Sequence, residues 1–472
     1  MKESAIVAAA LLLGCNTTPP ELLPPPFGPN GPQPTRLFFP TGMAQASGGV
    51  LLVANGNFNR AFEAGTVVSI KRKALDDLLS SNVDCAVANP DPVCTPPIDT
   101  PEAAAAFFAD AAMIGNYAGP LVLNTDKTAA YTGSRDSGKI NAVRVGSGGS
   151  LGCPPNAGDD ARKDCRAGII DLRSVGVEGP YAIAAGNSVL PGQAPQSVLF
   201  VSSIIPHIVS ISSAGIITST AVAALSMQDP SQLLFTMQAG SFFIDGGYGV
   251  GPMVFDEMRR QLYLSGCYQR STAFGAGEPG TGLCIGVVNN FLRILNVDAG
   301  SAAALYLLDL RADVLSTYTT QLLLDVPDPP ATLSAPPATL WATMRNPDSL
   351  VVIELPAQPS VAPRVREIVP LPVSPSDMVR IDRGIAPPLL AIVAERLGAV
   401  SIFDTGSNQV VAQVGRLGDS PFNIQQIDCP ASKPASACLA VSVFGNCRLA
   451  LIEVPKDAPS KTALRALAGS CP

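Results

Sequence analysis

The chain has one histidine, His207, and one tryptophan, Trp341, among its 472 residues. General acid–base and nucleophilic catalysis most often use histidine, and zinc sites use histidine or closely paired cysteines. We expect His207, in the segment SSIIPHIVSI, at a turn between strands as a loop or packing residue, and Trp341 on a buried strand. Phosphate-binding P-loops and EF-hand calcium loops have no match in the sequence. This inventory favours a protein that binds rather than catalyses, with no cofactor and no metal.

The first residues indicate export. An unbroken apolar run covers residues 5–13, which is too short to cross a bilayer and is typical of a secretory signal peptide. Residues 12–15 read LLGC and resemble the bacterial lipobox. The resemblance implies cleavage after residue 14 and acylation of Cys15, and Asn16 in the next position favours the outer membrane over the inner one. The alternative is an ordinary signal peptide with an incidental cysteine.

The cysteine count agrees with this interpretation. Eleven cysteines are present, and an odd number in an exported protein leaves one to be explained. If Cys15 carries lipid, ten remain, and they fall into short neighbouring intervals rich in Gly, Pro, Asn or Asp. We therefore expect five local disulfides, which pair Cys85 with Cys94, Cys153 with Cys165, Cys267 with Cys284, Cys429 with Cys438, and Cys447 with Cys471.

Composition divides the chain into three parts. After a signal peptide at residues 1–14, residues 15–35 combine the lipidated cysteine with a proline-rich tether, since eight prolines occur between residues 16 and 35. Proline-rich segments are extended, semi-rigid spacers. Residues 36–472 form the folded part. The formal net charge of −7 argues against nucleic acid as a partner.

The folded part repeats one pattern. Its clearest copy, residues 374–421, predicts four short strands at 378–381, 389–394, 399–403 and 409–414, separated by Gly, Asp and Asn turns. This copy resembles the YVTN-type β-propeller repeat found in lactonase-like and surface-layer-like proteins. Six further copies start near 40, 120, 180, 252, 340 and 421. The resemblance implies an all-β, seven-bladed β-propeller, and a pair of β-sandwiches is the structural alternative.

Two details of the ring follow. Unpaired strand edges invite aggregation, so we expect residues 36–39 (RLFF) to pair with the last blade and close the ring. Inserted helices are expected within residues 71–114, at 71–79 and 102–114.

In such a ring, the turns between second and third strands gather at one face around the central channel. We call this the candidate face. Arginine recurs there, and its forked donors suit carboxylates, sugars and peptide carbonyls. The turns carry Asn57, Arg60, Arg135, Asp136, His207, Arg345, Asp348, Glu395, Arg396 and Arg448.

The sequence thus predicts a lipid-anchored envelope protein that binds a protein, peptide or glycan through this face. One alternative is a lactonase-like or other hydrolase that uses carboxylates and arginine at the channel mouth. Another is a structural role in envelope assembly, by analogy of fold alone. Polar turns also occur for simple reasons of solvation.

Overall fold

The computed structural model describes residues 27–28, 31–34 and 36–471. Within the last range the gaps are 88–93, 99, 189–195, 204–206, 213–214, 220, 239–246, 269–288, 298–303, 310–317, 326–337, 346, 359–360 and 373. The predicted signal peptide, Cys15 and most of the predicted tether therefore lie outside the described residues. Among those described, no helix is both long and apolar enough to span a bilayer.

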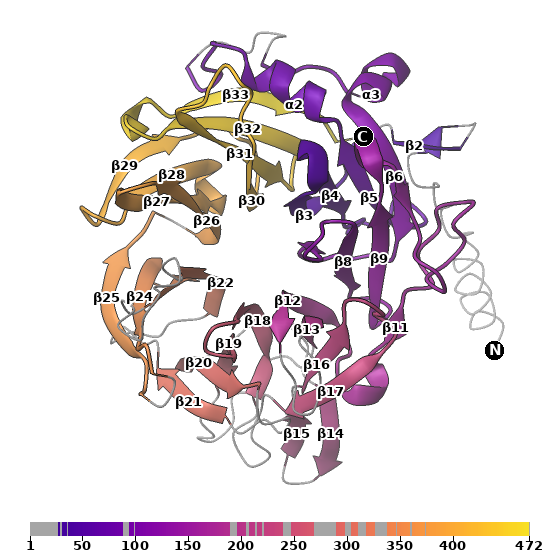
Figure 1. Ribbon diagram of the computed structural model, residues 1–472, viewed down its shortest axis with the longest axis vertical. Coiled ribbons are helices and arrows are strands. Elements are labelled where there is room, and N and C mark those ends of the chain that lie inside the picture. Colours follow the sequence, from indigo (N-terminus) through magenta and orange to yellow (C-terminus); the bar gives the residue numbers. More distant parts are fainter. Residues whose placement is uncertain are drawn as a thin grey trace, which may run out of the picture.

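Seven antiparallel sheets follow one another around a central axis (Figure 1). The first sheet comprises β3 (Pro40–Gln45), β4 (Leu51–Asn55), β5 (Gly65–Ile70) and β6 (Phe108–Ile114). The second comprises β7 (Val122–Leu123), β8 (Ala129–Ser134), β9 (Lys139–Val145) and β10 (Leu151–Gly152), with β11 (Ile170–Asp171) also paired to β9. The third comprises β12 (Pro180–Ser188), β13 (Gln196–Ser203), β16 (Ala221–Ser226) and β17 (Leu233–Gln238).

The remaining four sheets repeat the same up-and-down order. The fourth contains β18 (Gly247–Asp256), β19 (Gln261–Tyr268), β20 (Asn289–Asn296) and β21 (Ala304–Asp309). The fifth contains β22 (Tyr318–Asp325), β23 (Ala338–Arg345), β24 (Ser349–Leu355) and β25 (Arg364–Pro370). The sixth contains β26 (Pro375–Arg383), β27 (Ala386–Ala394), β28 (Ala399–Asp404) and β29 (Gln409–Val414). The seventh contains β30 (Pro421–Ile427), β31 (Ser436–Val443), β32 (Arg448–Pro455) and β33 (Ala463–Ala468).

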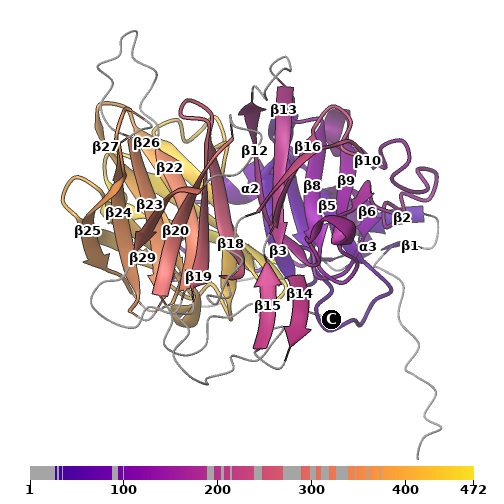
Figure 2. The ribbon, with the colours of Figure 1, turned by 90° about the horizontal axis from the view of Figure 1, so that it is seen from below.

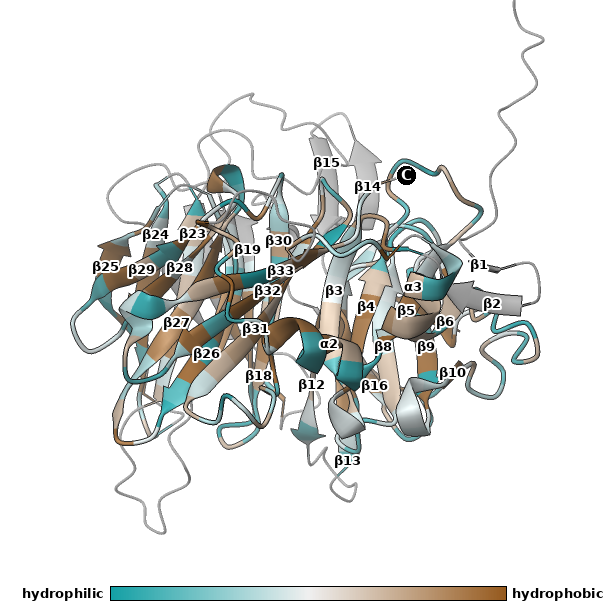
Figure 3. Ribbon diagram, turned by 90° about the horizontal axis from the view of Figure 1, so that it is seen from above, coloured by the Kyte–Doolittle hydropathy of each residue, from teal (hydrophilic) through white to brown (hydrophobic). Residues whose placement is uncertain are grey.

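The arrangement is a seven-bladed β-propeller. The first strands of neighbouring blades contact one another around the axis. Seven hydrophobic clusters fill the spaces between adjacent blades, one at each junction. Hydrophobic residues concentrate along the strands, and hydrophilic residues lie toward the strand ends and connections (Figure 3). Burial of both faces of each sheet explains the near-continuous Val, Ile, Leu and Ala runs that the repeats show.

The ring does not close by the strand exchange that the sequence analysis expected. All four strands of the seventh blade come from residues 421–468, and the segment 36–39 is not a strand. Phe39 has a left-handed backbone (φ 47°), and the backbone N–H of Phe38 donates to the Asn55 side chain at 3.1 Å. Leu37 instead inserts its side chain into the cluster between the first and seventh blades.

A different segment covers the outer edge of the seventh blade. Between β5 and β6, the first blade carries α2 (Arg72–Leu79) and α3 (Pro101–Phe107). The chain between them lies along β33: the N–H of Cys85 donates to the carbonyl of Leu464, and the N–H of Leu467 donates to that of Cys94, both at 2.7 Å. We call residues 81–87 and 94 the clasp. The clasp thereby gives hydrogen-bond partners to backbone groups at the outer edge of β33. In the closure expected from the sequence, an exchanged strand would have paired with the last blade instead.

The second predicted helix is only half correct. Residues 101–107 are helical, with the Thr100 side chain accepting from the N–H of Ala103 at its start. Residues 108–114 are β6, the fourth strand of the first blade, and they pair with β5 from Ile114 to Phe108. The Ala-rich sequence favours a helix, but pairing to the blade overrides that preference. The short strands β1 (Phe27–Gly28) and β2 (Gly31–Pro34), within the predicted tether, form a two-stranded ladder, and β2 lies beside β6.

Within the described residues, four disulfides join cysteines that are close together in the sequence. They join Cys85 to Cys94, Cys153 to Cys165, Cys429 to Cys438, and Cys447 to Cys471. The fifth expected pair, Cys267 with Cys284, falls outside the residues whose side chains are described. Disulfides in this number are typical of extracellular or periplasmic proteins.

Candidate functional site

The candidate face contains the connections between the second and third strands, together with those that lead from one blade to the next. On this face, the connection within the third blade differs from the one that the sequence predicts. The turn expected at His207 is replaced by an inserted hairpin, in which β14 (His207–Ser212) pairs with β15 (Gly215–Ser219). His207 thus starts an additional strand rather than lying in the turn. The hairpin projects from the ring on the side where the C-terminus lies (Figure 2).

Several of the predicted face residues stabilise the fold instead of facing a ligand. Asn57 is fully buried, and its amide donates to the carbonyl of Phe62 at 2.6 Å and to the Asn116 side chain at 2.7 Å. It therefore holds the β4–β5 loop closed. Arg448 donates to the carbonyl of Gly469 at 3.1 Å, which fixes the end of the chain against the β31–β32 turn.

Two other residues predicted for the face join two blades. Arg345, at the end of β23, forms an ion pair with Glu395 of the sixth blade and also donates to the carbonyl of Pro375 at 2.9 Å. Both side chains are mostly buried. Asp348 is half-buried, and its carbonyl accepts from the N–H of Leu371. The contacts of Arg345 lock the fifth blade to the sixth, whereas that of Asp348 stays within the fifth blade.

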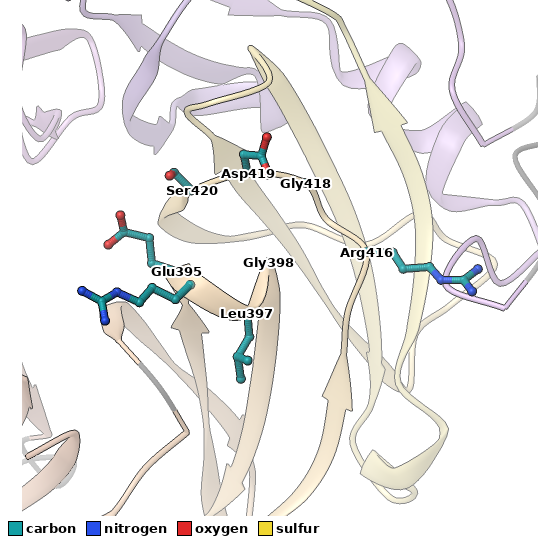
Figure 4. A pocket seen from close by; sticks show the side chains of 8 residues that line it. Glu395, Leu397, Gly398, Arg416, Gly418, Asp419 and Ser420 are labelled. Carbon is teal, nitrogen blue, oxygen red and sulfur yellow. The ribbon is translucent and has the colours of Figure 1, made fainter.

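Arg60, Asp136 and Arg396 are exposed. Arg396 and Glu395 line an open, polar depression of about 500 Å³ between the sixth and seventh blades. Figure 4 shows Glu395 on one side of it and Arg416 pointing away in the opposite direction. The charged groups therefore do not converge on a common point in this depression.

The side chains that do converge are aromatic. Six partly exposed rings lie on the candidate face, where the seventh, first, second and third blades meet, and two arginines lie over them. We call this set the aromatic–arginine cluster: Phe39, Phe58, Tyr117, Tyr181, Phe422, Phe444, Arg60 and Arg135.

Phe444 connects the rings of this cluster. Its ring centroid is 5.1 Å from that of Phe39, 5.0 Å from Phe58 and 6.2 Å from Phe422. Phe58 in turn packs edge-on against Tyr117 at 5.3 Å. The sequence analysis named the two arginines but missed the rings. A signal was present, because Phe39, Phe422 and Tyr181 each adjoin the proline that opens a first strand.

The cluster borders a cavity of about 310 Å³ between the first strands of the blades. Tyr181 and Phe422 belong to the cluster and also line this cavity. One wall of the cavity is a chain of polar groups that crosses three blades and reaches a fourth. Gln321 of β22 and Asn423 of β30 both donate to the carboxylate of Asp377 in β26. The Asn423 side-chain oxygen accepts from the N–H of Met43 in β3 at 3.0 Å. This polar chain ties the first strands together.

Asp377 is the one charged residue among those described as lining the cavity. Burial raises its pKa to about 6, against the opposing effect of the N–H donors of Ile424, Gln321, Met378 and Asn423. The sequence analysis missed it, although the position two or three residues into the first strand is polar in three successive repeats, as Gln321, Asp377 and Asn423. Within the described residues, no three His, Cys, Asp or Glu side chains gather into a metal site.

No protein-family model matches the chain, and neither does any curated protein sequence. Among solved structures, hydrazine synthase from Kuenenia stuttgartiensis superposes with a TM-score of 0.51 at 11% identity, covering 89% of this chain and 96% of that one. Periplasmic gluconolactonase from Pseudomonas aeruginosa gives 0.42 at 14% identity, covering 70% and 78%. The β-propeller domain of a Myceliophteria thermophila protein gives 0.47 at 10% identity, covering 88% and 97%. At these identities the likeness concerns the fold alone, and the chain is a seven-bladed β-propeller.

Proposed function

We propose that this protein is a lipid-anchored binding module of the bacterial cell envelope, and that the aromatic–arginine cluster receives a protein, peptide or glycan. The observation that carries the proposal is the gathering of six partly exposed rings and two arginines beside one cavity. Aromatic residues and arginine are enriched at interface positions that contribute most to binding. Clustered exposed apolar area of this kind marks interaction sites.

The envelope part of the proposal depends on sequence features and on the disulfides. The LLGC motif at residues 12–15 and the proline-rich segment after it resemble the anchor and tether of a bacterial lipoprotein, and the repeat resembles the YVTN type. Four disulfides fit an oxidising compartment outside the cytoplasm. A tether of this composition would hold the propeller away from the membrane surface.

Site-specific photocrosslinking in intact cells tests the binding face. A photoreactive amino acid replaces Asp136, which is exposed beside the cluster, and in a matched control it replaces Ile385, which is fully exposed in the β26–β27 hairpin at the opposite end of the blades. We expect a discrete adduct from position 136 that position 385 does not give. The adduct should also weaken when Phe444→Ala removes the ring that connects the cluster. Equal adducts from both positions, or none from position 136, would contradict the proposal.

The hydrolase alternative requires carboxylates that converge on the axis. Asp377 is the acidic side chain described in the cavity wall, and four N–H donors occupy its two oxygens. Because no second carboxylate lines the cavity among the described residues, we favour binding. Metal analysis of the purified protein, together with hydrolysis assays on lactones, tests the alternative directly.

A further inference from the structure

Among the described arginines, Arg135 stands out because its guanidinium lies against two aromatic rings. It lies in the β8–β9 turn, only partly exposed, with its guanidinium 5.1 Å from the ring centroid of Phe58 and 5.2 Å from that of Tyr181. Its Nε donates to the carbonyl of Tyr117 at 3.3 Å. The two aromatic rings and this hydrogen bond fix the orientation of the guanidinium.

Three other arginines that are largely removed from water have carboxylate partners, whereas Arg36 and Arg448 are partly buried and no carboxylate partner is described for either. Arg259 pairs with Asp256 at 2.8 Å, and Arg465 pairs with Glu453 at 2.7 Å. Arg345 pairs with Glu395. In the described part of the chain, Arg135 forms no such pair, although the whole protein carries a formal charge of −7. The neighbouring Asp136 is exposed and does not form an ion pair with it.

An unpaired, largely desolvated cation is costly unless something neutralises it. Burial lowers the pKa of the Arg135 guanidinium, while the phenols of Tyr181 and Tyr117 act in the opposite direction. The terminal nitrogens of its fork have no protein acceptor in the described residues, so they are available to an oxyanion. Arginine binds carboxylates in a bidentate manner, and a guanidinium already fixed by its neighbours loses little entropy on binding.

The surroundings favour a peptide over a sugar. One face of Phe58 and one of Tyr181 are covered by Arg135, and Arg60 lies 5.1 Å from the ring centroid of Tyr117. These faces are therefore not open for a sugar ring to stack on. Phe39, Phe422 and Phe444 extend the surface on the side of the seventh blade, and they offer apolar contact to side chains that flank an acidic group.

We propose that Arg135 anchors a carboxylate carried by a peptide ligand, with the flanking aromatic rings contacting apolar residues of the same peptide. The proposal deepens the binding function proposed above and rests on it. It assigns the peptide an Asp or Glu side chain, or a free carboxyl terminus, next to apolar residues.

Selection from a random octapeptide library tests it. The exported protein with its disulfides intact is immobilised, and peptides with free and with amidated carboxyl termini are screened separately. We expect acidic residues flanked by apolar ones among the amidated peptides selected, and a free terminus to substitute for them in the other set. Replacing the selected Asp by Asn should weaken binding at least about tenfold, since a hydrogen bond to a charged group is lost.

Variants of the protein separate this role from a merely structural one. Arg135→Gln should weaken the acidic peptide at least about tenfold but leave its Asn counterpart unchanged, whereas Arg135→Lys should recover part of the loss because the charge remains. Arg366→Gln, at an exposed arginine of the outer strand β25, is the matched control and should change nothing. Equal thermal unfolding midpoints establish that the variants are folded.

The contrary outcomes are distinct. Peptides that lack acidic groups, or equal selection by Arg135→Gln, would overturn the role of Arg135 but leave the binding face intact. Failure to select any peptide would overturn the peptide assignment. If uronic-acid oligosaccharides bind instead and lose binding in Arg135→Gln, the carboxylate is correct but its carrier is a glycan. A missing photoadduct at position 136 would refute the proposed function itself.

Discussion

The buried carboxyl of Asp377 should make stability fall as the pH rises. Its pKa is raised from 3.8 to about 6 by burial, so the folded protein holds the proton more tightly than the unfolded chain does. The stabilising effect is complete below about pH 3.8 and is lost as the pH rises through about 6. A tenfold change in proton affinity is worth about 1.4 kcal/mol, so the loss amounts to roughly 3 kcal/mol.

The substitution Asp377→Asn isolates this effect. Asparagine has nearly the same shape and does not titrate. Its carbonyl oxygen can accept from one pair of the four N–H donors around Asp377, and its NH2 group, like the O–H of a protonated carboxyl, is a donor. The variant should therefore resemble the wild type near pH 3.5. By about pH 7.5 it should gain roughly 3 kcal/mol relative to the wild type.

Urea unfolding at a series of pH values measures this difference, and the chain contains its own probe. Trp341 is the single tryptophan, is 4% exposed, and packs in the cluster between the fifth and sixth blades that also contains Met378, the neighbour of Asp377. Asp136→Asn, at an exposed position, controls for the exchange itself. The reasoning is refuted if Asp377→Asn loses stability relative to the wild type as the pH rises, because the four donors would then be holding an ionised carboxylate.

Three further outcomes are expected from the cysteines. Cys15→Ala should abolish acylation and release the protein from membrane fractions, and unchanged fractionation would contradict the lipid anchor. Peptide mapping without reductant should find Cys267 joined to Cys284, whereas a free thiol at either position in the exported protein would contradict that pair. Replacing both Cys85 and Cys94 by Ser should lower the free energy of unfolding by about 2–3 kcal/mol, the value for a closed loop of this length; a loss near zero in denaturant titrations would show that hydrogen bonds alone hold the clasp.

The sixth blade could be predicted from sequence almost strand by strand. The expected strands at 389–394, 399–403 and 409–414 match β27, β28 and β29 to within a few residues. Its strands are β-branched and apolar, and its turns carry Gly, Asp and Asn, so local preference and blade structure agree. In the third blade the same β-branched alternation occurs in an inserted hairpin, and sequence alone does not separate β14 from the true third strand, β16.

The site was harder to predict than the fold because it depends on contacts between blades. The position of Arg135 on the candidate face followed from the repeat, but its lack of a carboxylate partner depends on what Phe58 and Tyr181 bring from neighbouring blades. Likewise, whether Arg345 is available to bind a ligand depends on its ion pair with Glu395, which is fifty residues away in the sequence. Asp377 occupies a position of the repeat that is often apolar in the other blades. Comparison of the seven first strands would have identified Asp377 as a candidate site residue.

Because a clasp and not an exchanged strand closes the ring, the chain could be circularly permuted without dividing a blade. Every blade takes its strands from one continuous stretch of sequence, since none of the described strands is exchanged between the first and seventh blades. The two ends of the propeller also meet, because Leu37 packs among residues of the seventh blade. A circularly permuted gene that joins these ends and opens at another inter-blade connection would therefore keep each blade whole.

The clasp also affects folding during synthesis. Its residues can form their hydrogen bonds to β33 only after this last strand has left the ribosome.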